Sequence, residues 1–197
     1  LVADGYGRNL RPWARNELVI AGPKEDPAGI RGVASGAEAL RRIAAARAGF
    51  IDFHGIGSRE MAHKLWRMAG VTPAGSWLLQ DASGSNHGVL EFAARRRAYV
   101  IVGHIPMLFG KLRGDGVEVL VSGDTEMRRP YVVMEANPER FPEAHAAGAR
   151  ELADFLLSSA VQCFLAASPE NRRDGALLFH PVAARGCGPA CDCPRAS

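Results

Sequence analysis

The chain has 197 residues, of which 47% are hydrophobic and 23% are charged, and its formal net charge is +3. This length suffices for one large domain or two small lobes with a buried core, and the composition is that of an ordinary globular protein. Apart from the short run at residues 95–97, the arginines are scattered, which argues against the dense basic stripe of a nucleic-acid-binding protein. No apolar segment approaches the ~20 residues that cross a bilayer. We therefore expect neither a nucleic-acid partner nor a membrane span.

The first residues show an apolar strand between two turns. Residues 18–21 are apolar and run into a Gly-Pro turn and then an Asp-Pro-Ala-Gly turn, which ends at residue 29. Proline and glycine on both sides of a short apolar run indicate a strand that enters a new structural unit. The chain starts with Leu1, and no basic segment followed by an apolar one precedes the strand. We therefore expect a fragment of a longer protein.

Helices and strands alternate along the rest of the chain. Ser35 and Ser58 are expected N-caps, and Gly49 and Gly70 are expected stops, of the first two helices. The expected helices cover residues 35–48, 59–69 and 83–97, and two more lie within 142–167 with a break near 158–159. The expected strands cover residues 50–53, 77–79, 98–102, 117–121 and 131–134. This alternation predicts an α/β fold with a mostly parallel sheet.

Two loops combine glycine and serine between a strand and a helix. Free backbone N–H groups and the positive end of the helix dipole favour an anion at such a place, and serine hydroxyls add donors. The alternative is that Ser58 and Ser85 only cap their helices, which is common in α/β proteins. The candidate ligand-binding residues are Gly57, Ser58 and Arg59 in the first loop and Ser83, Gly84, Ser85 and Asn86 in the second.

The histidines suggest an enzyme only weakly. Asp52 and His54 are two positions apart at a strand end and share one face. The spacing from His54 to His63 matches no zinc signature, and the sequence contains no serine nucleophile elbow, HExxH motif or phosphate-binding loop. A metal-dependent hydrolase is therefore a distant alternative. We expect no catalysis, no metal site and no cofactor.

The four cysteines fall into two groups. Cys163 lies in an apolar helical segment, where we expect a free, buried thiol. Cys187, Cys191 and Cys193 crowd the Gly/Pro-containing end of the chain. They could hold a soft metal or form a disulfide, but three thiols without a fourth ligand make a weak site. We expect residues 182–197 to form a flexible tail.

The beginning of the chain resembles a known family. Residues 5–11 read G-Y-G-R-N-L-R, and residues 16–32 read N-E-L-V-I-A-G-P-K-E-D-P-A-G-I-R-G. This order resembles the periplasmic tungstate-binding component of ABC transporters, and residues 120–124 and 129–138 resemble the return crossover of that family. The resemblance implies a two-lobed, type II periplasmic-binding-protein-like fold that is incomplete at its N-terminus. The implied parts are a remnant of lobe I with the first crossover (1–20), lobe II (21–126), and the return crossover with the last helices (127–181).

The resemblance also implies a function. Members of the family bind a small oxyanion, tungstate or molybdate, and deliver it to the membrane component of the transporter; we expect a periplasmic monomer. In the family an arginine and a threonine of the first loop help to hold the ligand. Here the arginine position falls near Phe53, Ser58 stands in for the threonine, and Arg59 is adjacent. His104 lies where the family has a further polar segment and is also a candidate ligand-binding residue. The alternative function is a sensing or degenerate binding module for a different small ligand.

Overall fold

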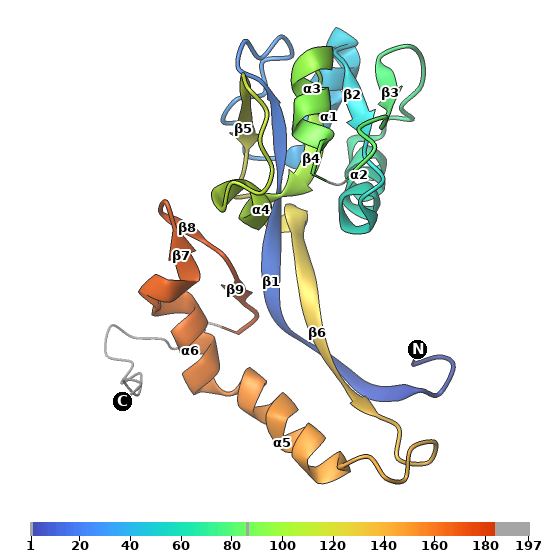
Figure 1. The fold of residues 1–197 in the computed structure, drawn as a ribbon, viewed down its shortest axis with the longest axis vertical. Coiled ribbons are helices and arrows are strands. Elements are labelled where there is room, and N and C mark those ends of the chain that lie inside the picture. Colours follow the sequence, from blue (N-terminus) through green and yellow to red (C-terminus); the bar gives the residue numbers. More distant parts are fainter. Residues whose placement is uncertain (1, 86, 184–197) are drawn as a thin grey trace. The chain divides into compact units, whose positions relative to one another are not determined.

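The computed structural model describes residues 2–85 and 87–183 (Figure 1). The chain divides into two compact units. The central unit is Glu17–Arg129, and the terminal unit combines Leu1–Asn16 with Pro130–Ser197. Two paired strands, β1 (Gly7–Pro23) and β6 (Arg128–Ala136), both cross the boundary between these units. The chain therefore enters the central unit on β1 and leaves it on β6.

The strands of the central unit pair in a mixed way, so the expectation of a mostly parallel sheet is wrong for the strands that pair with β1. Strand β1 pairs antiparallel with both β4 and β5, so β4 and β5 run in the same direction. Strand β2 pairs parallel with β3, and a parallel bridge from Phe50 to Tyr99 joins β2 to the segment that leads into β4. Strand β1 thus runs opposite to β4 and β5, between which it lies. The strands after β1 are β2 (Phe50–Asp52), β3 (Leu78–Gln80), β4 (Val100–Gly103) and β5 (Val117–Val121).

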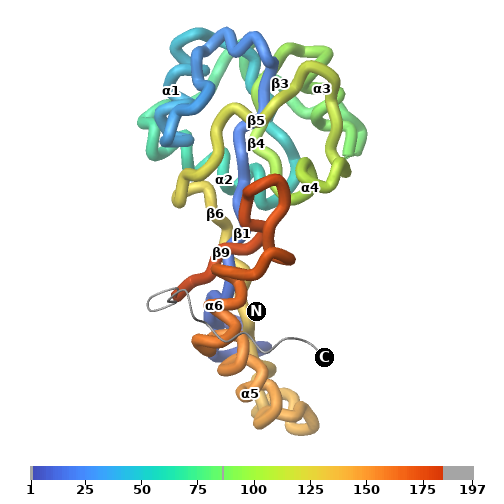
Figure 2. Tube along the Cα trace, turned by 90° about the vertical axis from the view of Figure 1, so that its left-hand side faces the viewer, coloured from blue at the N-terminus to red at the C-terminus, as the bar shows by residue number. Residues whose placement is uncertain are grey.

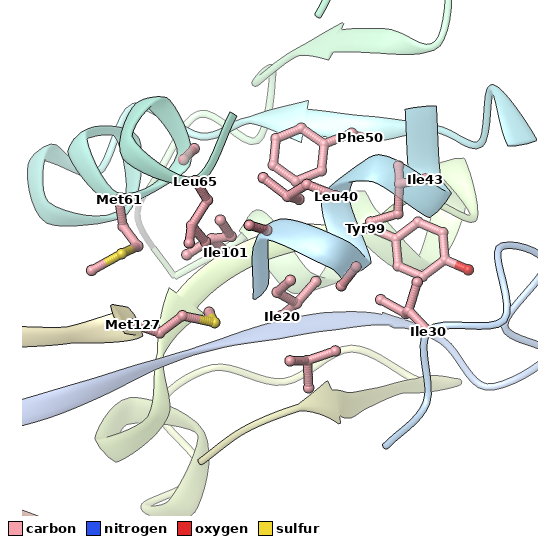
Figure 3. Packing of buried hydrophobic residues seen from close by; sticks show 14 of the residues in the cluster. Ile20, Ile30, Leu40, Ile43, Phe50, Met61, Leu65, Tyr99, Ile101 and Met127 are labelled. Carbon is pink, nitrogen blue, oxygen red and sulfur yellow. The ribbon is translucent and has the colours of Figure 1, made fainter. Parts of the chain in front are cut away.

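Both faces of this sheet are covered by helices. Alternate side chains of a strand point to opposite faces, and the side chains of β1 divide in this way between two apolar clusters. Leu18 and Ile20 pack in a cluster with residues of α1 and α2, in which Figure 3 labels Ile20. Val19 and Ala21 pack with residues of α3. The helices of this unit are α1 (Gly36–Ala46), α2 (Ile56–Ala69), α3 (Val89–Arg96) and α4 (His104–Leu108), with a 3₁₀ turn η1 at Thr125–Met127.

Some of the expected helix ends are confirmed. Ser35 caps α1, because its Oγ accepts a hydrogen bond from the backbone N–H of Glu38. Gly70 ends α2 in the left-handed conformation. The expected stop at Gly49 is wrong, because Arg47 takes the left-handed conformation two residues earlier. A β carbon at Gly49 would lie 3.1 Å from that of Ala98, so close packing explains this glycine.

The other two expected helix starts are wrong. Helix α2 begins at Ile56 after Gly55, so Ser58 lies inside the first turn and does not cap the helix. Helix α3 begins at Val89, and residues 83–85 belong to the loop that precedes it. A hydrogen bond of 3.1 Å from the N–H of Gly88 to the Oγ of Ser85 closes a turn in this loop and delays the start of the helix.

The terminal unit contains the expected pair of helices (Figure 2). Helices α5 (Ala146–Leu157) and α6 (Ser159–Ala167) are separated at Ser158, whose Oγ caps α6 by accepting from the N–H of Val161. Gln162 is buried and donates to the carbonyls of Trp13 and Leu156. After α6 come η2 (Pro169–Asn171), β7 (Arg172–Arg173), β8 (Ala176–Leu177) and β9 (His180–Pro181), of which β9 pairs with β1.

Cys163 corrects one expectation. The residue is buried as expected, but it is disulfide-bonded and so is not a free thiol. The spacing of an apolar helix predicts burial, whereas the oxidation state depends on a partner that the helix pattern does not reveal. Cys187, Cys191 and Cys193, and with them the expected flexible tail, lie outside the described residues from position 184 onward.

Every helix within the described ranges is too short or too polar to cross a membrane.

Candidate ligand site

The candidate segments lie at one edge of the central sheet. Strands β2, β3 and β4 run in the same direction, so the loops after their carboxyl ends meet at the same edge, where open α/β sheets bind their ligands. The loop after β2 approaches the loop after β3, with the Nδ1 of His54 at 3.9 Å from the Oδ2 of Asp81. This edge therefore brings residues 54–59, 81–85, 87–88 and 103–104 to one side of the unit.

The first turn of α2 presents unpaired donors. A helix leaves its first backbone N–H groups without partners inside the helix, and Gly55 before α2 offers no side chain to cap them. Ser58 lies in this turn and is 8% exposed. A serine beside uncapped N–H groups at the positive end of a helix is suited to an anion.

Gly57 lies in the same turn and packs against an arginine that is distant in the sequence. A β carbon at Gly57 would overlap the Nη1 of Arg129 and would come within 2.9 Å of its Cζ. The guanidinium therefore lies directly on the first turn of α2. Both residues belong to the central unit, and Arg129 is contributed by the start of β6. Only a glycine permits this approach without a shift.

Arg59 is directed elsewhere. Its Nη2 donates a hydrogen bond of 2.8 Å to the Oδ2 of Asp52, the last residue of β2. Asp52 is the better buried of the two, with a side chain 17% exposed against 42% for Arg59. The pair is therefore a local ion pair between the end of β2 and the start of α2. The charge that was expected to face the ligand is balanced by this carboxylate.

The second loop uses its hydroxyls internally. The N–H of Ser83 donates to the Oδ1 of Asp81, and the Oγ of Ser83 donates to the carbonyl of Ser85, both at 2.9 Å. The Oγ of Ser85 accepts from Gly88, and Gly84 has a positive φ of 72°. Asn86 lies outside the described residues. These contacts are those of a self-contained turn, in which Ser83 and Ser85 neither cap α3 nor leave their hydroxyls to a ligand.

His104 is the first residue of α4 and faces a buried acid. Its Nδ1 lies 3.2 Å from the Oε2 of Glu17, and the Oε1 of Glu17 accepts a hydrogen bond from the N–H of Gly123. Glu17 is 5% exposed. These contacts link Glu17 of β1 to His104, directly after β4, and to Gly123, shortly after β5. His104 thus has a structural partner at the candidate edge.

Sequence reasoning missed Glu17 and Arg129. A charged residue directly before the apolar run at 18–21 was the available signal for Glu17, because buried acids need partners. Arg129 gave no such signal, since its contact with Gly57 joins two distant parts of the chain. Within the described ranges, no group of three or more histidine, cysteine or acidic residues could hold a metal ion. The pairs His54–Asp81 and His104–Glu17 each lack a third such residue among the described ones.

Known proteins resemble this chain in sequence and structure, although no protein-family model matches it. The "Putative ABC transporter anion-binding protein" of Haloferax volcanii is 32% identical over 190 residues, which cover 91% of this chain and 53% of that protein. The chain thus spans about half the length of this curated relative. The solved tungstate-binding protein TupA of Desulfovibrio alaskensis G20 has a TM-score of 0.75 at 25% identity, covering 92% of this chain and 73% of that one. The structure titled as the tungstate ABC transporter of Geobacter sulfurreducens has a TM-score of 0.63 at 32% identity, covering 81% and 68%.

Proposed function

The chain belongs to the family of ABC-transporter solute-binding components that includes the tungstate-binding proteins, and we propose that it binds a small oxyanion of the tungstate and molybdate class. In this proposal the protein delivers the anion to the membrane component of an ABC transporter. The relatives are named as binding proteins and not as enzymes, and their likeness confirms the expected α/β fold of the periplasmic binding proteins.

One observation carries the proposal. The fourteen-residue helix α2 begins without a side-chain cap at the carboxyl edge of the sheet, and Ser58 adds a hydroxyl to its first turn. Free N–H groups and the helix dipole favour an anion there. Hydrogen bonds to a charged group contribute about 1.5–3 kcal/mol each, so several such donors support tight binding without any chemical step.

We place the protein in the periplasm and expect it to act as a monomer. Disulfides persist in oxidising compartments such as the periplasm and are rare in the cytosol, and Cys163 is disulfide-bonded. This observation supports the localisation independently of the names of the relatives.

Calorimetric titration of the full-length protein with tungstate, molybdate and sulfate tests the proposal. We expect saturable binding of at least one of these anions, and Ser58→Ala should weaken it about tenfold because one donor to the charged ligand is lost. Ser76→Ala, at an exposed position of the same unit, is the matched control and should leave the affinity unchanged. The absence of heat with all three anions would refute the oxyanion function.

A sensing module for a different small ligand is the second candidate. The pairing of Arg59 with Asp52 and the internal hydrogen bonds of Ser83 favour it, because these groups are not set aside for an oxyanion. A thermal-shift screen of the full-length protein against neutral and carboxylate solutes separates the two. Stabilisation by one of these solutes and by none of the oxyanions would support the second candidate.

A further inference from the structure

A basic cleft of about 450 Å³ lies in the central unit, with Arg47, Arg95 and Arg96 in its lining together with Trp77. We propose that this cleft binds a soluble anion that carries two or more neighbouring phosphate groups. The proposal goes beyond the oxyanion function and does not rest on it, because it concerns a different edge of the sheet.

The cleft lies where two strands begin and two helices end. Gly49, which also lines it, directly precedes β2, and Trp77 directly precedes β3. Arg47 follows the end of α1, and Arg96 is the last residue of α3. Because β2 and β3 are parallel, their first residues share one edge, whereas the candidate ligand site follows their carboxyl ends. The cleft is therefore a separate place on the unit and contains none of the candidate ligand residues.

The three arginines carry charges that no carboxylate balances among residues 2–85 and 87–183. Each of them is exposed, and none forms an ion pair or a side-chain hydrogen bond within these ranges. The described residues that line the cleft include no acid. Other arginines of the same unit are paired, since Arg41 and Arg42 of α1 both contact Glu38. The cleft thus holds three positive charges that are free to meet an anion.

The helix ends explain why positive charge is tolerated here, but not why it gathers in one cleft. The negative end of a helix dipole stabilises a cation, which suits Arg95 and Arg96 in the last turn of α3. Their guanidinium carbons lie 6.0 and 5.8 Å from the centre of the Phe92 ring, so one ring contacts both. Arg47 comes from a different helix. Three like charges from two helices repel one another, and a multivalent anion between them relieves this repulsion.

The lining favours neighbouring phosphate groups over a single small anion. A guanidinium presents its N–H donors in a planar fork that matches the oxygens of a phosphate, and three such forks exceed what one phosphate can engage. Trp77 is half-buried and offers an apolar wall. The volume of the cleft lies within the range of about 300–1,000 Å³ that is typical of pockets for small organic molecules. Pyrophosphate and tripolyphosphate are the simplest probes of this ligand class.

Calorimetric titration of the full-length protein with these two probes tests the proposal. We expect one bound molecule per chain, and at least about tenfold weaker binding of orthophosphate, which engages fewer arginines. Arg47→Ala, Arg95→Ala and Arg96→Ala should each lower the tripolyphosphate affinity about fivefold, and the triple variant about a hundredfold, because exposed ion pairs are individually weak and add where they are independent. Tripolyphosphate should change the tryptophan fluorescence of the parent, and Trp77→Phe should abolish this change.

Arg150→Ala is the matched control, because Arg150 is an exposed arginine of α5 in the terminal unit. It removes the same charge and should leave the tripolyphosphate affinity unchanged, and thermal melting shows that each variant keeps its fold. Saturating tungstate should not compete with tripolyphosphate, so a failure of the oxyanion function would leave this result intact.

Three outcomes would overturn the proposal. The first is the absence of saturable binding of both polyphosphates, and the second is an equal loss of affinity in Arg150→Ala and Arg96→Ala. The third is binding to vesicles that contain phosphatidic acid, lost in the triple variant, without binding of either free polyphosphate. That result would assign the arginines to a lipid surface.

Discussion

Replacing Tyr99 with phenylalanine removes the hydroxyl that holds the loop after β1. Tyr99 is fully buried, and its hydroxyl donates to the Oδ1 of Asp26 at 2.8 Å and accepts from the N–H of Ala28 at 2.9 Å. Burial raises the pKa of Tyr99, and the nearby Asp26 carboxylate acts in the same direction, so the hydroxyl keeps its proton. The Asp-Pro-Ala-Gly turn of the family motif is thus attached to the core through one side chain.

The magnitude follows from these two hydrogen bonds. A bond to a charged group is worth about 1.5–3 kcal/mol and a neutral one about 0.5–1.5 kcal/mol. Asp26 and Ala28 are both partly exposed, so water replaces part of what is lost. We expect Tyr99→Phe to lower the free energy of unfolding of the central unit by about 2 kcal/mol. With a urea m-value of about 2 kcal/mol/M, the midpoint falls by about 1 M.

Urea unfolding followed by tryptophan fluorescence measures this change. In a Trp13→Phe background the remaining tryptophans, Trp66 and Trp77, both report on the central unit. Tyr6→Phe is the control, because Tyr6 belongs to the terminal unit and its ring is partly exposed; its midpoint should not move. A Tyr99→Phe midpoint within about 0.25 M of the parent would show that the loop does not depend on this hydroxyl, and the reasoning would be refuted.

Three further predictions concern charge and oxidation. Burial raises the pKa of Asp26, but hydrogen bonds from two backbone N–H groups of its loop and from Tyr99 outweigh it and leave the pKa below the ordinary 3.8. The stability that Asp26 adds relative to Asp26→Asn should therefore be full at pH 6 and be lost as the pH falls through the lowered pKa in urea titrations. The side chain of Glu135 is 2% exposed, accepts a hydrogen bond of 3.0 Å from Asn9 and lies 3.6 Å from Arg11, so Glu135→Ala should destabilise the protein by about 2–3 kcal/mol in urea unfolding, since the hydrogen bond to this buried charged group is lost. Reduction with dithiothreitol should cost about 2–4 kcal/mol and lower the melting temperature of the parent, but not that of Cys163→Ser.

The elements of the central unit were predictable where local pattern decides them. Residues 18–21 form part of β1, and their alternation between two apolar clusters explains why each of them is apolar. Strand β1 extends back to Gly7. This polar segment does not show the alternation of apolar and polar residues that is typical of a strand. Its pairing with β6 and β9 in the terminal unit explains this extension, and such pairing depends on partners far along the chain.

The helix ends show where local rules fail. Arg47 and Arg97 both end helices in the left-handed conformation, with φ of 49° and 47°. Glycine is the usual residue there, so sequence reasoning placed the stop of α1 at Gly49. The chain instead uses that glycine where β2 approaches Ala98. A glycine in the sequence does not reveal whether it serves a turn or a close contact.

The same ambiguity governs the candidate site. Gly57 and Ser58 were predicted as ligand residues from the loop pattern, and the structure places them in the uncapped first turn of α2. The pattern could not show that Arg59 turns to Asp52, nor that Arg129 covers Gly57, because both contacts depend on the path of the folded chain. The family motif at residues 23–29 therefore reports the scaffold, which Tyr99 holds in place. The choice of ligand depends instead on the groups at the first turn of α2, and titration with tungstate, molybdate and sulfate tests whether they hold an oxyanion.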